Sequence, residues 1–282
     1  MTGPEAGTQS SNPRVPQSRV DTTVPHPARR YNYWLGGKDN FEPDRASGDA
    51  IAAMFPTVRT AAIENRRFLR RAVRYLATQA GVRQFLDVGT GIPAPDNTHE
   101  VAQAAAPTSR VVYVDNDPIV MAHARALLGS GPEGATAYLE ADLRQGTQLL
   151  RQPEMTQTLD LSQPVALLLV AILHFLDDAD DPYTIVADLV RELPSGSYLV
   201  ASHAAVEVMA PDMRAKAEAA AASGQHGGFQ FRTRAEFSRF FDGMELVPPG
   251  VVSVADWRAD DEPQPRPTPA EVGGYGAVAR IP

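Results

Sequence analysis

The chain has 282 residues, no cysteine and a formal net charge of −8. This length allows one large α/β domain or two small ones. The lack of cysteine excludes disulfides and thiolate metal sites and suits a reducing cytosol, and an acidic chain is a poor general binder of nucleic acid. No apolar run approaches the roughly 18 residues of a membrane span, so we expect a cytoplasmic protein with no membrane partner.

The first 28 residues hold Pro, Ser, Thr and Gly and contain no apolar run like that of a secretory signal. We therefore expect a disordered leader over 1–28 and a single domain over 29–282. Within this domain, residues 29–81 should form a lid and helices, and residues 82–282 should form the core.

An aromatic, charged segment follows the leader, with the sequence RRYNYWLGGKDNFEPDR over 29–45. It shows neither helical nor strand periodicity, so it is predicted to be a loop. One interpretation is a lid over a ligand pocket, in which Tyr31 and Tyr33 contact the ligand and Lys38 or Asp39 reaches into the site. The alternative is an aromatic plug that anchors the N-terminus to the core.

Two helices are predicted between Arg45 and Gly81, separated near Pro56, and Asp44 is placed to cap the first. The second helix has an apolar side and an opposite basic side. The basic side consists of Arg66, Arg67, Arg70, Arg71 and Arg74. We interpret it as a solvated helix face, and docking of an anionic substrate or RNA is the alternative.

A short apolar strand, Phe85–Val88, ends at Gly89 and Gly91, with Thr90 between them. Glycine can take positive φ and leave backbone N–H groups facing a ligand. The Gly-x-Gly-x-x-Ala spacing also fits a dinucleotide fingerprint, so the loop alone leaves NAD open. Asp87 favours a cationic ligand, because a carboxylate at this place would repel a pyrophosphate.

The run from Asp87 to Gly91 resembles the first motif of class I S-adenosylmethionine (SAM) methyltransferases, whose ligand carries an ammonium and a sulfonium. Pro93 and Pro95 place the next helix start near Thr98, and so long a loop fits poorly over a pyrophosphate. An NAD-dependent oxidoreductase is therefore the less favoured alternative. Asn97 lies before that helix, whose free N–H groups can receive the methionine carboxylate.

The second predicted strand, Arg110–Asp115, ends at a carboxylate that can bind both ribose hydroxyls of an adenosine cofactor. Asp115 does not separate SAM from NAD, since both carry this ribose. Asn116 is placed near the adenine edge. Further strands are predicted over Thr136–Ala141, Val165–Ala171, Ser197–His203, Glu245–Val254 and Tyr275–Ile281.

These motifs together resemble a bacterial family of SAM-dependent methyltransferases once catalogued as a domain of unknown function (DUF574). The segments that carry the resemblance are Arg30–Arg45, Phe85–Pro93, Asn97–Ala102, Val112–Pro118 and Leu173–Phe175. The resemblance implies SAM as cofactor, S-adenosylhomocysteine (SAH) as product and an α/β, Rossmann-like class I fold. This fold has a seven-stranded, mostly parallel sheet with the last strand antiparallel, helices on both faces, and here an N-terminal lid.

The class I fold also implies roles for residues at later strand ends. Asp142 and Leu143 follow the third strand, where such enzymes hold adenine, and Ala171 and Ile172 end the central strand beside the cofactor. His174 would lie beside the transferred methyl group, where its unperturbed pKa near 6.5 suits a base. A structural hydrogen bond to the neighbouring loop is an equal interpretation of this histidine. No metal site is expected.

The sequence therefore predicts an enzyme that transfers methyl from SAM to a small molecule by in-line displacement. The small-molecule acceptor is a default, because no motif such as Asn/Asp-Pro-Pro-Tyr marks an amino group of DNA or protein. A SAM-binding sensor without methyl transfer is the alternative from another functional class. The oligomeric state is left open.

Overall fold

The structure is a computed structural model that describes residues 21–224 and 226–282. Residues 1–20 of the leader expected over 1–28 lie outside the described residues. Residues 21–28 are described and lead into helix α1, Pro27–Trp34. The first helix thus starts inside the predicted leader. No helix in the described ranges is long and apolar enough to cross a membrane.

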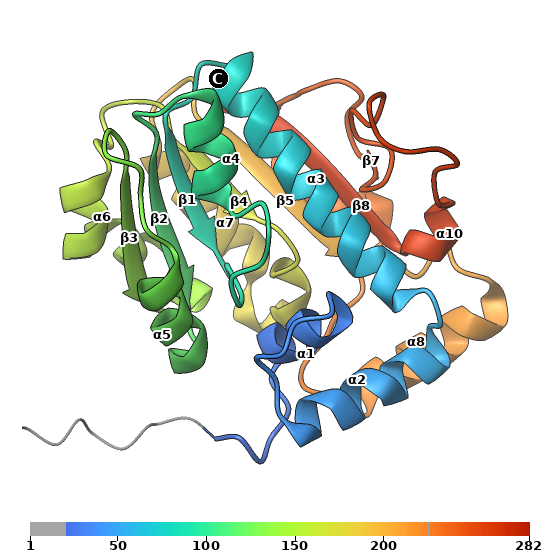
Figure 1. Cartoon of the computed structure of the whole chain (residues 1–282). Helices are drawn as coiled ribbons and strands as arrows, with labels where there is room; N and C mark the ends of the chain where they lie inside the picture. Colours follow the sequence, from blue (N-terminus) through green and yellow to red (C-terminus); the bar gives the residue numbers. More distant parts are fainter. Residues whose placement is uncertain (1–20, 225) are drawn as a thin grey trace, which may run out of the picture.

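A mixed eight-stranded sheet forms the centre, with strand order β3-β2-β1-β4-β5-β8-β6 and β7 paired with β8 (Figure 1). Its strands are β1 Gln84–Val88, β2 Arg110–Asp115, β3 Ala135–Glu140, β4 Ala166–Leu169, β5 Tyr198–Ala204, β6 Glu245–Leu246, β7 Val252–Ser253 and β8 Gly274–Arg280. The first five are parallel, whereas β8 is antiparallel to β5. The carboxyl ends of the parallel strands therefore meet at one edge, as the sequence predicts.

The predicted strand over Glu245–Val254 is two short strands, and this accounts for eight strands in place of seven. Both β6 and β7 pair antiparallel with β8. Pro248, Pro249 and Gly250 interrupt the ladder between them, because proline has no N–H to donate and Gly250 has a φ of 83°. The two pieces together occupy the place of a sixth strand.

Helices cover both faces of the sheet. They are α2 Glu42–Met54, α3 Val58–Thr78, α4 Thr98–Ala105, α5 Pro118–Leu127, α6 Pro153–Thr158, α7 Pro182–Glu192, α8 Pro211–Ala222, α9 Arg234–Ser238 and α10 Pro269–Val272, with 3-10 turns η1 Leu143–Arg151, η2 Leu173–Phe175, η3 Asp178–Asp180 and η4 Arg239–Phe241. One apolar core packs α3, α4 and α5 on the sheet, and the other packs η1, α6, α7 and α9. Successive side chains of a strand enter opposite cores, so Phe85 lies in the first and Leu86 in the second.

The loop prediction for 29–45 is wrong, because α1 and the start of α2 fall in this segment. The buried side of α1 consists of Arg29, Arg30 and Asn32, so the helix carries no apolar periodicity. Asp44 lies in the first turn of α2, where it accepts the Phe41 N–H at 2.9 Å, and the helix starts three residues earlier than expected. Figure 1 shows α1, α2 and α8 beyond the carboxyl ends of the parallel strands.

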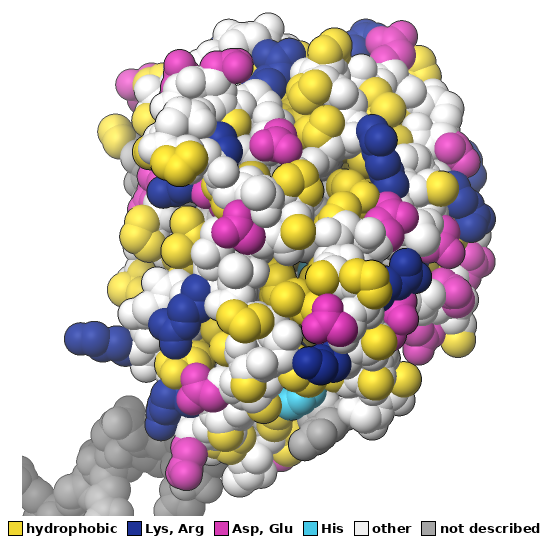
Figure 2. Space-filling view, turned by 90° about the vertical axis from the view of Figure 1, so that its right-hand side faces the viewer, with side chains coloured by type: hydrophobic (Ala, Val, Ile, Leu, Met, Phe, Trp, Pro, Cys, Tyr) yellow, Lys and Arg dark blue, Asp and Glu magenta, His cyan; other side chains and the backbone are white. Residues whose placement is uncertain are grey.

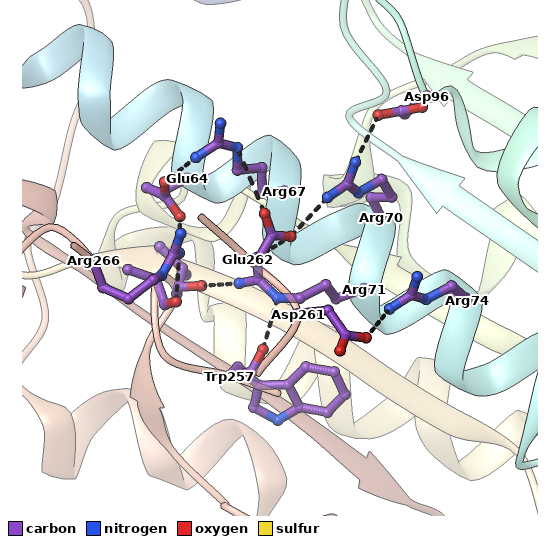
Figure 3. Close-up of polar contacts among 12 residues, drawn as sticks. Glu64, Arg67, Arg70, Arg71, Arg74, Asp96, Trp257, Asp261, Glu262 and Arg266 are labelled. Atoms are coloured by element: carbon purple, nitrogen blue, oxygen red, sulfur yellow. Dashed lines mark hydrogen bonds and ion pairs between the residues drawn. The ribbon is translucent and has the colours of Figure 1, made fainter. Parts of the chain in front are cut away.

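The middle of the basic side of α3 is not a solvated face, since carboxylates of the chain pair with it, whereas Arg74 at its end stays exposed (Figure 3). Arg70 and Arg71 donate to Glu262 at 2.7 and 3.0 Å, and Arg71 is only 4% exposed. Arg67 donates to Glu64 at 2.7 Å. Arg70 and Arg71 attach the segment after Trp257 to α3 through Glu262. Because these arginines are already paired within the chain, docking of an external anion on them is disfavoured.

Candidate active site

A cavity of about 550 Å³ opens at the carboxyl ends of the parallel strands. Such a volume falls within the range that holds drug-sized ligands. Its walls come from the glycine loop after β1, the ends of β2 to β5, and helices α1, α3 and α8. Most of the residues predicted to contact a cofactor line it: Tyr31, Asp87, Gly89, Thr90, Gly91, Asp115, Asn116, Asp142, Leu143, Ala171 and Ile172.

Three of the predicted contacts do not line the cavity. The Tyr33 hydroxyl donates to Asp49 at 2.8 Å on the outer side of α1, and Lys38 is exposed in the turn that follows. Asn97 is the N-cap of α4. Its side-chain oxygen accepts from Arg66 at 3.0 Å, and Arg66 does line the cavity. Of the contacts expected from the N-terminal segment, Tyr31 lines the cavity and Tyr33 and Lys38 do not.

The glycine loop is shaped by backbone conformations that only glycine adopts easily. Gly89 and Gly91 have φ values of 76° and 68°. A Cβ on Gly89 would lie 2.7 Å from the side chain of Ile172, so this position is closed to any larger residue. The Gly91 N–H donates to Asp115 at 2.9 Å, which ties the loop to the end of β2.

Asp87 provides a buried negative charge beneath this loop. One of its oxygens accepts from the Thr98 hydroxyl at 2.6 Å, and the other makes no hydrogen bond among the described residues. Burial raises the pKa of Asp87 to about 6, although Thr98 and Arg66 oppose the rise. A buried carboxylate with a free oxygen fits a cationic ligand group, which would return the pKa toward its ordinary value.

Asp115 and Asp142 place two more carboxylates along the same wall. Asp115 accepts from the N–H groups of Gly91 and Asp117, both at 2.9 Å, and burial raises its pKa to about 6. Asp142 accepts from the Asn116 amide at 2.9 Å and also caps the η1 turn. Each oxygen of Asp115 keeps a second lone pair, so this side chain can still bind hydroxyl groups. Both oxygens of Asp142 also accept from the Arg144 guanidinium at 3.3 Å, and a ligand would share them with this arginine.

Comparison with known proteins identifies the cofactor. The sequence model of a family described as S-adenosyl methyltransferase matches residues 13–282 of the chain. The chain belongs to this family. A DUF574 family protein from Streptomyces avermitilis MA-4680 is 46% identical with a TM-score of 0.87, covering 94% of this chain and 100% of that chain. A candidate methyltransferase from Thermobifida fusca YX is 41% identical with a TM-score of 0.82, covering 92% and 95%. None of the functionally curated proteins compared with the chain matches it.

The chain is thus a SAM-dependent methyltransferase, and the features of the cavity fit this cofactor. The glycine loop with its close approach at Gly89, the free oxygen of Asp87 and the paired oxygens of Asp115 match a ligand with a cationic end and a ribose. In a dinucleotide site the carboxylate of Asp87 would repel the pyrophosphate, so this residue disfavours NAD.

In this methyltransferase, two histidines, His174 and His203, line the cavity, and their hydrogen bonding differs. His203 donates from Nδ1 to the Ala204 carbonyl at 2.7 Å, so its Nε2 accepts from Arg232 at 3.1 Å. Both nitrogens of this ring are engaged, and burial lowers its pKa to about 4. His174 lines the cavity with a buried Nδ1 that has no hydrogen-bond partner among the described residues. The structural hydrogen bond considered for His174 is therefore not made by this nitrogen.

The ring of His174 lies in an aromatic environment. Its centroid is 4.5 Å from the rings of Phe175 and of Phe229. Burial, His203 and Arg232 together lower the pKa of His174 well below 6.5. The imidazole is consequently neutral at pH 7, which is the state that accepts a proton.

A chain of hydrogen bonds joins α1 to the strand ends in the methyltransferase. The Ala171 N–H donates to Ser202, whose hydroxyl donates to Asn65 at 2.6 Å. Asn65 donates to the Tyr31 hydroxyl at 3.0 Å, and Tyr31 donates to the Ala62 carbonyl at 2.8 Å. Sequence reasoning missed Asn65 and Ser202. The available signal was a polar residue within an otherwise apolar stretch, as at Ser202 near the end of β5.

Proposed function

We propose that this methyltransferase methylates a small, largely apolar molecule, with His174 taking the proton that the acceptor loses. Bound SAM supplies a methyl group on a sulfonium, which is a good leaving group. The carboxylates of Asp87 and Asp115 would hold its amino and ribose ends, and Asp142 with Leu143 its adenine. Ala171 and Ile172, which follow β4 and line the cavity, would contact it as well.

The proposal of an apolar acceptor rests on the residues that line the cavity around His174. Besides this ring, the acceptor side is lined by Phe229, Phe231, Met209 and the alanines of α8. Figure 2 shows hydrophobic side chains spread over the face that bears α8 and α10, with charged ones between them. Apolar walls exclude water and would hold a small ligand in near-attack geometry.

His174 suits the role of base better than His203. Both nitrogens of His203 are hydrogen-bonded, so accepting a proton there requires breaking the contact with Arg232. His174 has no hydrogen bond at Nδ1 to break among the described residues, although its lowered pKa makes the neutral ring a weak base. A general base contributes about 10²–10⁴ in rate where the acceptor must be deprotonated.

The first test follows radiolabelled methyl from SAM into a cell extract separated by size. We expect label in the small-molecule fraction, and label only in protein or nucleic acid would contradict the proposal. With the acceptor isolated, His174→Gln should lower kcat about 10²–10⁴-fold while SAH affinity stays unchanged. His123→Gln, on the surface of α5, is the matched control and should retain full activity. Full activity of His174→Gln would remove this residue as the base.

A further inference from the structure

Two adjacent arginines of α1 are equally buried but differ in their partners. Arg29 and Arg30 are each 4% exposed. Arg29 lies 3.6 Å from Asp44 and 3.7 Å from Asp117, and it does not line the cavity. Arg30 lines the cavity and has no carboxylate within 4.0 Å among the described residues.

The few contacts of Arg30 are with neutral groups. One terminal nitrogen donates to the His226 carbonyl at 2.7 Å and to the Ser47 hydroxyl at 3.3 Å. Its Nε is buried without a partner. A guanidinium has five N–H groups in a planar fork that matches a carboxylate, so most of its binding capacity is unused here.

Burying a cation without an anion is costly in free energy, and the lowered pKa of Arg30 reflects this cost. Burial lowers the pKa of Arg30 to about 10, and Asp44 opposes the change only in part. Both oxygens of Asp44 are already taken by the N–H groups of His26 and Phe41. A buried charge of this kind is ordinarily paired, so an anion supplied by a ligand would complete the site.

Arg30 belongs to the acceptor side of the cavity. The segment after α8 joins it to the candidate base, since His226 accepts from Arg30 and the ring of Phe229 lies 4.5 Å from that of His174. Arg30, His174 and Phe229 also line one and the same cavity, so a ligand in that cavity can contact all three.

The other cations of the cavity wall have different positions. Arg66 donates to the carbonyls of Ala94 and Pro95 beside the glycine loop and lowers the pKa of Asp87, so it lies at the cofactor end. Arg144 is paired with Asp142 and Asp180. Among the described cations of the wall, Arg30 is the one buried near the acceptor and free of a carboxylate.

We propose that Arg30 binds a carboxylate of the methyl acceptor, so the substrates are small apolar or aromatic carboxylic acids methylated at another atom. The inference rests on the proposed function, because it assumes that the acceptor occupies the compartment of His174. The carboxylate pairs with the free edge of the guanidinium, and the apolar body lies against Phe229 and Phe231.

The test uses a set of aromatic and aliphatic acids, such as 4-hydroxybenzoate and 4-hydroxycinnamate, each paired with its primary amide. Binding to the SAH-loaded protein is measured by calorimetry. At least one acid should bind tenfold or more tightly than its amide, and Arg30→Met should abolish this difference while leaving SAH affinity unchanged. Arg30→Lys, which keeps a charge but not the planar fork, should retain part of the preference.

Arg29→Met is the matched control in the neighbouring position. It removes a paired buried arginine, so it should lower Tm yet keep the preference for acids, whereas Arg30→Met should not lower Tm more than Arg29→Met does. Equal affinity of every acid and its amide, or a preference that survives in Arg30→Met, would overturn the proposal. A tenfold loss of SAH affinity in Arg30→Met would overturn it too and assign this residue to the cofactor carboxylate. Failure of the proposed function gives a different result, because in the labelling experiment the radioactive methyl group would then appear only in macromolecules or would not be transferred at all.

Discussion

Replacing Asp87 with Asn should make the SAM-free protein more stable and its cofactor affinity weaker. The wild-type carboxyl has its pKa raised from 3.8 to about 6 by burial. A tenfold change in acidity is worth about 1.4 kcal/mol, so the ionised form costs the fold about 3 kcal/mol at pH 7.5. Asn keeps an oxygen for the Thr98 hydroxyl and carries no charge, so it removes this cost.

The pH dependence gives the prediction a second, independent check. Because the folded-state pKa of Asp87 is raised, the stability that its protonation confers is fully present below about pH 4 and lost as the pH rises through 6. The advantage of Asp87→Asn should therefore fall to roughly half at pH 5. In the wild type, SAM affinity should decline as the pH falls below 6, because protonation removes the charge that faces the cationic ligand.

Thermal unfolding with and without SAM measures both effects. At pH 7.5 the variant should gain several degrees in Tm, since each kcal/mol corresponds to about 2–4 °C in a protein of this size. SAM binding should weaken by about 1.5–3 kcal/mol, the worth of a hydrogen bond to a charged group. Asp256→Asn, at an exposed position, should change neither quantity. A variant less stable than wild type at both pH values would refute the reasoning.

Two further substitutions test other parts of the molecule. Asp115→Ala should weaken SAM binding by about 1–3 kcal/mol in calorimetry and leave a cooperative thermal transition; unchanged affinity would remove this residue from the site. Glu262→Gln should lower the free energy of unfolding in urea by about 3 kcal/mol, because it leaves Arg71 buried with a weaker partner. Asp261→Asn, whose side chain is 87% exposed, should cost at most about 1 kcal/mol, and equal losses in the two variants would count against a special role for Glu262.

The core of the fold could be predicted because its signals are local. The strands β1 and β2 and the apolar run of β4 are all found where the sequence places them. Each depends on residues within a few positions of one another, so no tertiary information is needed. The glycine loop and the strand-end carboxylates follow for the same reason, once parallel strands are assumed to share an edge.

The N-terminal part of the site could not be predicted in the same way. Tyr31 and Tyr33 are equivalent in a loop, but in a helix residues two apart point in different directions, and only Tyr31 faces the cavity. The sequence gives no apolar periodicity for helix α1, because its buried side is polar and pairs with distant groups such as Asp117. The partners of the α3 arginines are hidden for the same reason, since Glu262 lies almost two hundred positions from Arg71.

The position of β8 has a consequence for how the molecule is made. This strand, the last in the chain, lies between β5 and the short strands β6 and β7, and all three pair with it. Until residues 274–280 leave the ribosome, β5 has an unpaired edge along seven residues, and such an edge is open to pairing with other chains. The nascent protein therefore keeps the edge of β5 open until β8 has been made and has paired with it.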